Sequence, residues 1–107
     1  MLISTATFIR ENTSVPFYSI EDQFRDLYQT RYTETGKTNT QSKLSEDGLT
    51  LSVYSFWKSK AAFDEFVFDA DAIVMKEARL LYCISNNITL DYHGELINDD
   101  NDPIPME

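Results

Sequence analysis

Apolar and polar residues alternate along four stretches of this chain, and a period of two residues predicts β-strands. The first stretch, residues 2–10, carries apolar groups on both faces, as expected of a strand that is covered on two sides. Residues 38–45 are polar and rich in threonine, which predicts a weak or edge strand. Residues 49–57 show the strongest alternation, and residues 87–96 form the last stretch.

Two segments between these strands have the period of a helix. The apolar residues Ile20, Phe24, Leu27 and Tyr28 form one stripe, which predicts an amphipathic helix that ends at residues 33–38. A second helical period covers residues 59–86 and fits either one long helix or two helices with a bend near residues 69–71. The apolar side of this segment, which is expected to face the core, consists of Phe63, Phe66, Val67, Ala70, Val74, Ala78 and Leu81.

The order of these elements is β-α-β-β-α-β, and Asp47 and Gly48 supply a hairpin turn between the second and third strands. With right-handed crossovers, this order predicts an α+β, ferredoxin-like fold, a four-stranded antiparallel sheet with two helices on one face. The other face of the sheet still carries apolar groups, among them Tyr54 and Phe56. Because a soluble monomer rarely exposes such a surface, we expect a second copy to cover it in a symmetric homodimer.

Length and charge limit the classes of partner. The 107 residues suffice for one domain, which we expect at residues 1–96, followed by an acidic tail at residues 97–107. The chain has 9 basic and 18 acidic residues and a formal net charge of −9. Such a surface repels nucleic-acid phosphates and anionic lipids, so we expect neither a nucleic-acid partner nor a membrane partner.

Cysteine content and the first residues predict the compartment. The single cysteine, Cys83, excludes an intramolecular disulfide and is compatible with a reducing environment. Residues 1–10 lack the basic and apolar regions of a signal peptide, and no apolar run approaches the roughly 20 residues that span a bilayer. These features predict a soluble cytoplasmic protein.

The stretch "FWKSKAAF", residues 56–63, resembles a motif of the dimeric α/β-barrel superfamily, in its antibiotic-biosynthesis-monooxygenase-like branch. There a strand ends in a Trp, a Ser or Asp follows, and the next helix opens with an Ala-Phe pair. The resemblance implies two subunits whose sheets face each other in a barrel, each with a pocket between sheet and helices. Members include cofactor-free oxygenases of quinols or polycyclic phenols, haem-degrading enzymes and proteins of no known activity.

The residues that the haem-degrading members use have no equivalents here. Those members use an Asn on the first strand, a Trp in the second helix and a His after it. The matching positions hold Ala6, Phe66 and Arg79, the last through the likeness of "KEAR" to the family's "KEAH"-like segment. Alanine cannot donate a hydrogen bond to haem-bound dioxygen, and arginine does not ligate iron. We therefore expect no haem degradation and no cofactor.

Trp57 and His93 are the most conspicuous candidates for chemistry. Trp57 can stack on an aromatic substrate, but the sequence favours a structural role at the junction between strand and helix. His93 shares a strand face with Asp91 and Glu95, which suggests a metal site or an oriented base. Without a second histidine nearby, a polar strand face is the favoured interpretation, and we expect no metal.

The sequence thus favours a homodimer that is non-catalytic or binds a small apolar or aromatic ligand. The alternative is a cofactor-independent monooxygenase acting on a quinol or phenol, which the protein would bind and orient while stabilising a developing oxyanion. In that case Tyr54, Trp57, Arg79 and His93 are the candidate catalytic residues.

Overall fold

The structure is a computed structural model that describes residues 2–19, 22–97 and 103–105, with the backbone alone at residues 94–97 and 103–105. Strands and helices occur in the predicted order. The elements are β1 (Leu2–Ile9), α1 (Asp22–Tyr28), the π-helical segment η1 (Gln29–Thr33), β2 (Thr38–Leu44), β3 (Thr50–Trp57), α2 (Lys60–Val67), α3 (Ala70–Ser85), β4 (Thr89–Ile97) and β5 (Pro103–Pro105).

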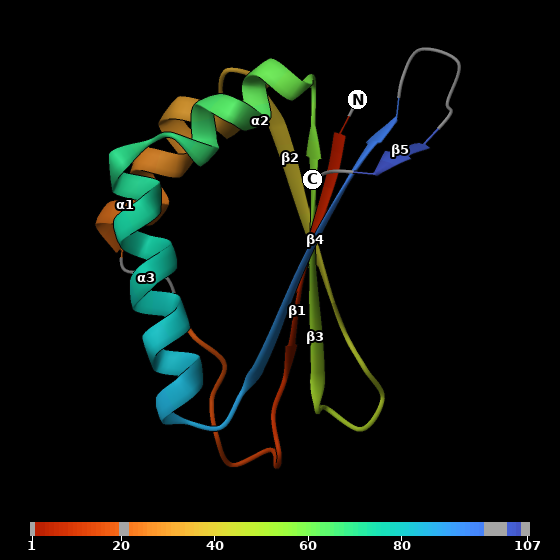
Figure 1. Ribbon diagram of the computed structural model, residues 1–107. Coiled ribbons are helices and arrows are strands. Elements are labelled where there is room, and N and C mark those ends of the chain that lie inside the picture. The colour runs from red at the N-terminus through yellow and green to blue at the C-terminus, as the bar shows by residue number, and fades with distance from the viewer. Residues whose placement is uncertain (1, 20–21, 98–102, 106–107) are drawn as a thin grey trace.

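The strands form one antiparallel sheet in the order β2-β3-β1-β4-β5. Helices α1, α2 and α3 all lie on one face of this sheet (Figure 1). The prediction of a ferredoxin-like α+β fold with four principal strands is therefore confirmed. The short edge strand β5, which pairs with the end of β4, was not predicted and lies within the predicted acidic tail. Residues 98–102, 106 and 107 of that tail lie outside the described residues, and the division of the chain at residue 96 stays a prediction.

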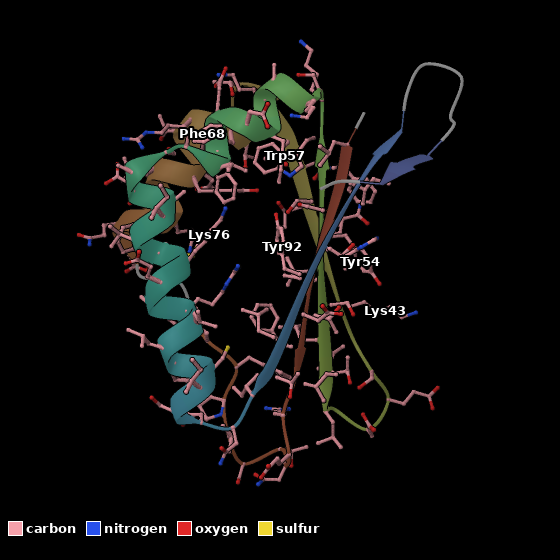
Figure 2. The ribbon with its side chains drawn as sticks, viewed as in Figure 1. Lys43, Tyr54, Trp57, Phe68, Lys76 and Tyr92 are labelled. Atoms are coloured by element: carbon pink, nitrogen blue, oxygen red, sulfur yellow. The ribbon has the colours of Figure 1, made fainter. Side chains whose placement is uncertain are left out.

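Strand register separates the two faces of the sheet. Ala6 on β1 lies opposite Tyr92 on β4, and both are on the face that the helices cover. The preceding residue of β1, Thr5, lies opposite Tyr54 on β3 and His93 on β4, on the other face. Figure 2 shows Tyr92 pointing toward the helices and Tyr54 pointing away from them. The predicted alternation of faces along these strands is confirmed.

The second helical segment consists of two helices, which decides between the alternatives that its sequence left open. Ser59 begins α2, and its side chain accepts a hydrogen bond from the amide of Ala62 at 3.1 Å. Phe68 ends this helix and is 79% exposed. Asp69 then begins α3, and its carboxylate accepts a hydrogen bond from the amide of Asp71 at 3.0 Å. The end of α2 at Phe68 and the cap of α3 at Asp69 are adjacent in sequence. The residues at this point therefore fix the break between the two helices.

The break changes which side of α3 faces the core. Val74 and Leu81 were expected to be buried, but they are 54% and 66% exposed, so this prediction was wrong. Ala72, Met75 and Cys83 are buried instead. The prediction continued the apolar stripe of α2 across the break, where the helical phase starts again. The exposed side of α3 consequently carries large apolar side chains, namely Ile73, Val74, Leu80, Leu81 and Ile84.

The first helix ends at Thr33, within the predicted range, because η1 continues α1. Ile20, part of the predicted apolar stripe, lies outside the described residues. In η1, Tyr32 is buried, and its hydroxyl donates a hydrogen bond to Asp69 Oδ2 at 2.6 Å. Arg31 forms an ion pair with the same carboxylate at 2.9 Å. These contacts fasten η1 to the corner between α2 and α3. None of the described helices is long and apolar enough to cross a membrane.

Candidate functional site

A cavity of about 130 Å³ lies between the helix-facing side of the sheet and helix α3. All four principal strands and all three α-helices contribute to its lining. An apolar cavity of about 150 Å³ in a protein interior can bind benzene. The space therefore suits a molecule with one aromatic ring.

Trp57, at the end of β3, lines the cavity and also belongs to the core. It is only 1% exposed, and its indole N–H donates a hydrogen bond to Ser4 Oγ at 3.1 Å. Its ring centroid lies 5.1 Å from that of Phe66, 5.6 Å from that of Phe63 and 5.7 Å from that of Tyr32. These contacts agree with the structural role that the sequence favoured for Trp57, and one side of the residue still borders the cavity.

Two cations, Lys76 and Arg79, reach the cavity from α3. Their spacing of three residues places them on the same side of the helix. Figure 2 shows Lys76 pointing into the space between α3 and the sheet. Lys76 Nζ lies 4.3 Å from the ring centroid of Phe66, and Arg79 Cζ lies 5.6 Å from that of Phe8. Both cations therefore rest on aromatic rings.

Burial penalises both positive charges. It lowers the pKa of the Lys76 ammonium, and the neighbouring Arg79 charge lowers this pKa further. Burial also lowers the pKa of the Arg79 guanidinium, although Tyr92 and Cys83 offset part of the effect. Arginine nevertheless stays charged in proteins because its pKa is intrinsically so high. The cavity therefore keeps at least one partly desolvated positive charge at any ordinary pH.

No carboxylate neutralises these cations within the described part of the chain. Neither Lys76 nor Arg79 forms an ion pair there, and the cavity lining contains no aspartate or glutamate. Arg79 Nε is buried and has no hydrogen-bond partner among the described residues. The sequence as a whole has twice as many acidic as basic residues, 18 against 9, so carboxylates are not scarce. The local excess of positive charge is a property of this cavity.

Hydroxyl groups supply the other polar atoms of the lining. Tyr92 forms a hydrogen bond with Ser4; burial raises the pKa of the Tyr92 phenol, and this bond lowers it in part. On the opposite side of the cavity, the Tyr28 hydroxyl lies 3.0 Å from Thr40 Oγ1, which in turn lies 3.4 Å from Ser55 Oγ. These groups are donors and acceptors that can orient a polar ligand, and none of them is a base at neutral pH.

The four candidate residues from the sequence divide between the two faces of the sheet. Trp57 and Arg79 line the cavity together. Tyr54 and His93 lie on the face that the helices do not cover, away from the cavity. A catalytic role for any of the four stays a prediction.

The positions that the resemblance matched to haem-degrading residues lie around this same cavity. Ala6, Phe66 and Arg79 all line it, and only Arg79 among them has a polar side chain. Within the described residues, no group of three or more His, Cys, Asp or Glu side chains gathers where it could hold a metal ion. The predicted neighbour of His93 on its strand face, Glu95, has a side chain outside the described part.

Lys76 and Tyr92 are cavity residues that the sequence interpretation missed. Tyr92 was assigned correctly to the apolar face of its strand, but nothing indicated that a cavity would lie over it. Lys76 stands three residues before Arg79, so any prediction that turned Arg79 inward also turned Lys76 inward. This three-residue spacing was the feature of the sequence from which Lys76 could have been predicted as a cavity residue.

No family model matches this chain, and no curated protein matches it. Several solved structures resemble it. A candidate antibiotic biosynthesis monooxygenase from Deinococcus radiodurans shares 12% identity at a TM-score of 0.49, over 92% of this chain and 94% of that one. Hydroxynitrile lyase from Passiflora edulis shares 16% identity at a TM-score of 0.48, with the same two coverages. Rv0793 from Mycobacterium tuberculosis shares 14% identity at a TM-score of 0.41, over 92% and 99%.

At 12 to 16% identity, these likenesses concern the path of the chain. The chemistry of the cavity has to be derived from its own residues.

Proposed function

We propose that this chain is a homodimeric α/β-barrel protein that binds a small aromatic molecule in the cavity beside Trp57. The observation that carries the proposal is the cavity of about 130 Å³, which combines aromatic walls with hydroxyl groups and cations. Pockets that bind small molecules are typically apolar, with a few polar groups that fix orientation. A cavity of this kind can bind a ligand without catalysing a reaction.

A binding role without catalysis is supported by the kind of polar groups in the cavity. General acid–base catalysis needs a group that exchanges a proton near the working pH, usually a histidine or a carboxylate. The described lining has neither; the only histidine, His93, lies on the other face of the sheet. Cys83 is buried and is not among the lining residues.

A cofactor-independent monooxygenase is the second candidate, and the two cations favour it. Arg79 and Lys76 would stabilise the anion of a phenol or quinol that entered the cavity. An ionised phenol is electron-rich and can itself supply electrons to dioxygen, so the protein would need only to bind and orient it. Trp57 and Arg79 are the predicted catalytic residues that this mechanism would use at the cavity.

Thermal unfolding with a panel of one-ring phenols, quinols and aromatic acids tests these functions. A ligand at ten times its Kd stabilises the fold by about 1.4 kcal/mol. For a domain of this size, that raises the Tm by roughly 7 °C. Binding with oxygen consumption at an oxygen electrode would support the enzyme, and binding alone would support the ligand-binding protein. A panel without any hit would contradict both.

The homodimer in this proposal uses the sheet face that no described helix covers. Ile3, Tyr54 and Phe56 lie on that face among threonines and serines, and all three are partly buried already within one chain. A twin sheet would remove their remaining apolar surface from water. Tyr54 and His93 would then lie at the subunit interface.

Sedimentation at micromolar concentration tests the dimer. Tyr54→Lys is expected to give monomers, because it places a charge in the proposed interface. Leu81→Lys is the matched control on the exposed side of α3 and is expected to leave the dimer intact. A dimer that only Leu81→Lys dissociates would place the interface on α3, and a monomeric wild-type protein would contradict the barrel.

A further inference from the structure

We propose that the cavity selects a small aromatic carboxylate, of about the size of benzoate, whose carboxylate is bound by Arg79 and Lys76. This inference rests on the proposed ligand-binding function and adds the chemical class of the ligand. It follows from the charges, the geometry and the volume of the cavity.

The unpaired charges give the first argument. Some exposed cations pair with carboxylates: Arg31 with an aspartate at 2.9 Å, Lys37 with a glutamate at 2.6 Å and Lys60 with an aspartate at 3.0 Å. A cation that stays in water, such as Lys43, needs no such partner. Lys76 and Arg79 are more buried than a surface cation and have no such partner in the described part of the chain. Desolvating a charge is costly unless an opposite charge meets it. An anionic ligand would supply that opposite charge at the place where the protein supplies none.

The arrangement of donors favours a carboxylate over other anions. Arg79 lines the cavity, and its planar guanidinium offers parallel N–H donors that match the two oxygens of a carboxylate. Lys76, three residues earlier on the same side of α3, adds a second positive charge. A phenolate has one oxygen, so it meets both donors only through a single shared atom, whereas a carboxylate gives each donor its own oxygen.

The remaining walls suit an aromatic ring. Besides the cations and hydroxyl groups, the lining is apolar or aromatic, with Val53 and Trp57 from β3 and Phe66 and Met75 from the helices. The volume of about 130 Å³ is close to the cavity of about 150 Å³ that accepts benzene. A single ring bearing a carboxylate therefore matches both halves of the cavity, whereas a polycyclic ligand exceeds it.

Calorimetric titration with benzoate, benzamide and 4-nitrophenolate tests this selectivity on the wild-type protein. Benzamide has nearly the shape of benzoate but no charge. Hydrogen bonds to charged groups are individually strong, so benzoate is expected to bind about tenfold more tightly than benzamide, or better. 4-Nitrophenolate shares its charge between the phenolate oxygen and the nitro group, so neither end carries the full charge of a carboxylate, and it is expected to bind more weakly than benzoate.

Matched variants locate the binding groups. Arg79→Met and Lys76→Met are each expected to weaken benzoate about tenfold while changing benzamide by less than about twofold. Arg79→Lys, which keeps the charge but loses the planar edge, is expected to fall between wild type and Arg79→Met. Lys43→Met is the control, since Lys43 points away from the cavity on the other face of the sheet (Figure 2). It is expected to change neither affinity.

The outcomes separate this inference from the proposed function. Equal or tighter binding of benzamide would overturn the selectivity for anions and leave a cavity that binds neutral aromatics. Tighter binding of 4-nitrophenolate would overturn the preference for a carboxylate. Failure of all three probes to bind would overturn the inference together with the proposed function. Should Arg79→Met not fold, the Lys76→Met variant and the comparison of the three probes on the wild-type protein still test the selectivity for a carboxylate.

Discussion

Replacing Trp57 tests whether this residue mainly holds the fold together. Trp57→Phe keeps most of the ring but removes the indole N–H, whose hydrogen bond to Ser4 Oγ spans 3.1 Å in a buried environment. Such a bond contributes about 1 kcal/mol net, and leaving a buried acceptor short of a donor adds to the loss. Ser4 keeps a second partner in Tyr92. We therefore expect Trp57→Phe to lower the free energy of unfolding by about 1–2 kcal/mol.

Trp57→Ala removes the ring as well. The ring contacts four other aromatic residues, with centroids 5.1 to 6.4 Å away, and almost none of it reaches solvent. Truncation of a large buried aromatic side chain to alanine costs about 3–5 kcal/mol. A domain has only about 5–15 kcal/mol of stability in total. Trp57→Ala is therefore expected to lose a large share of the stability and to lower the Tm by roughly 15–25 °C.

Urea unfolding followed by far-UV circular dichroism measures these changes without depending on tryptophan fluorescence. Phe68→Ala is the matched control, because it truncates an aromatic side chain that is 79% exposed. It is expected to change the free energy of unfolding by less than about 0.5 kcal/mol. If Trp57→Ala cost no more than Phe68→Ala and yet abolished ligand binding, Trp57 would be a ligand-binding residue and the packing argument would be refuted.

Three further predictions concern the corner, the hairpin and the thiol. Asp69→Ala should cost about 2–4 kcal/mol in urea unfolding, because it removes the cap of α3 and the partner of Tyr32 and Arg31. Burial alone would raise the pKa of Asp69, but hydrogen bonds from Tyr32 and Arg31 outweigh it and hold this pKa below its ordinary value. The stability that the carboxylate contributes is thus present at neutral pH and lost as the pH falls below about 4, so Asp69→Asn should flatten the acid limb of a stability–pH curve. Gly48→Ala should cost about 1–2 kcal/mol, since φ is +73° there and a Cβ would meet a side-chain methyl at 3.3 Å. Cys83 is 1% exposed and burial raises the pKa of its thiol, so it should react with a thiol reagent only after urea unfolds the protein.

The alternation of residues was sufficient to predict the faces of the strands. A period of two places Ala6 and Phe8 together on β1, and it separates Tyr54 from Trp57 on β3. The same period separates Tyr92 from His93 on β4. What alternation does not give is the face that the helices cover. Tyr54 was placed on the face without helices by its apolar character, and it stood beside Trp57 and His93 as a site candidate although Tyr54 and His93 lie away from the cavity.

The break between α2 and α3 shows a second limit. The sequence placed a possible bend close to Asp69, but a helix could have continued through it. Asp69 prevents a continuous helix because its carboxylate caps α3. The same carboxylate also binds Tyr32 and Arg31, which are 37 and 38 residues away in sequence. Contacts between residues so far apart in sequence cannot be predicted from a local pattern of apolar and polar residues. The phase of α3, and with it the exposure of Val74 and Leu81, followed from the same contacts.

Helix α3 buries Ala72, Met75 and Cys83 but departs from the usual distribution at its cations and leucines, and this departure connects the fold to the proposed site. Its inner side turns Lys76 and Arg79 toward the sheet, while its outer side exposes Leu80, Leu81 and Ile84. A helix that served packing alone would bury the leucines and leave the cations in water. Departures from the hydrophobic pattern are expected where a protein has a functional site, because there local stability is traded for a specific surface. The inward cations therefore argue for a cavity that exists to meet an anion.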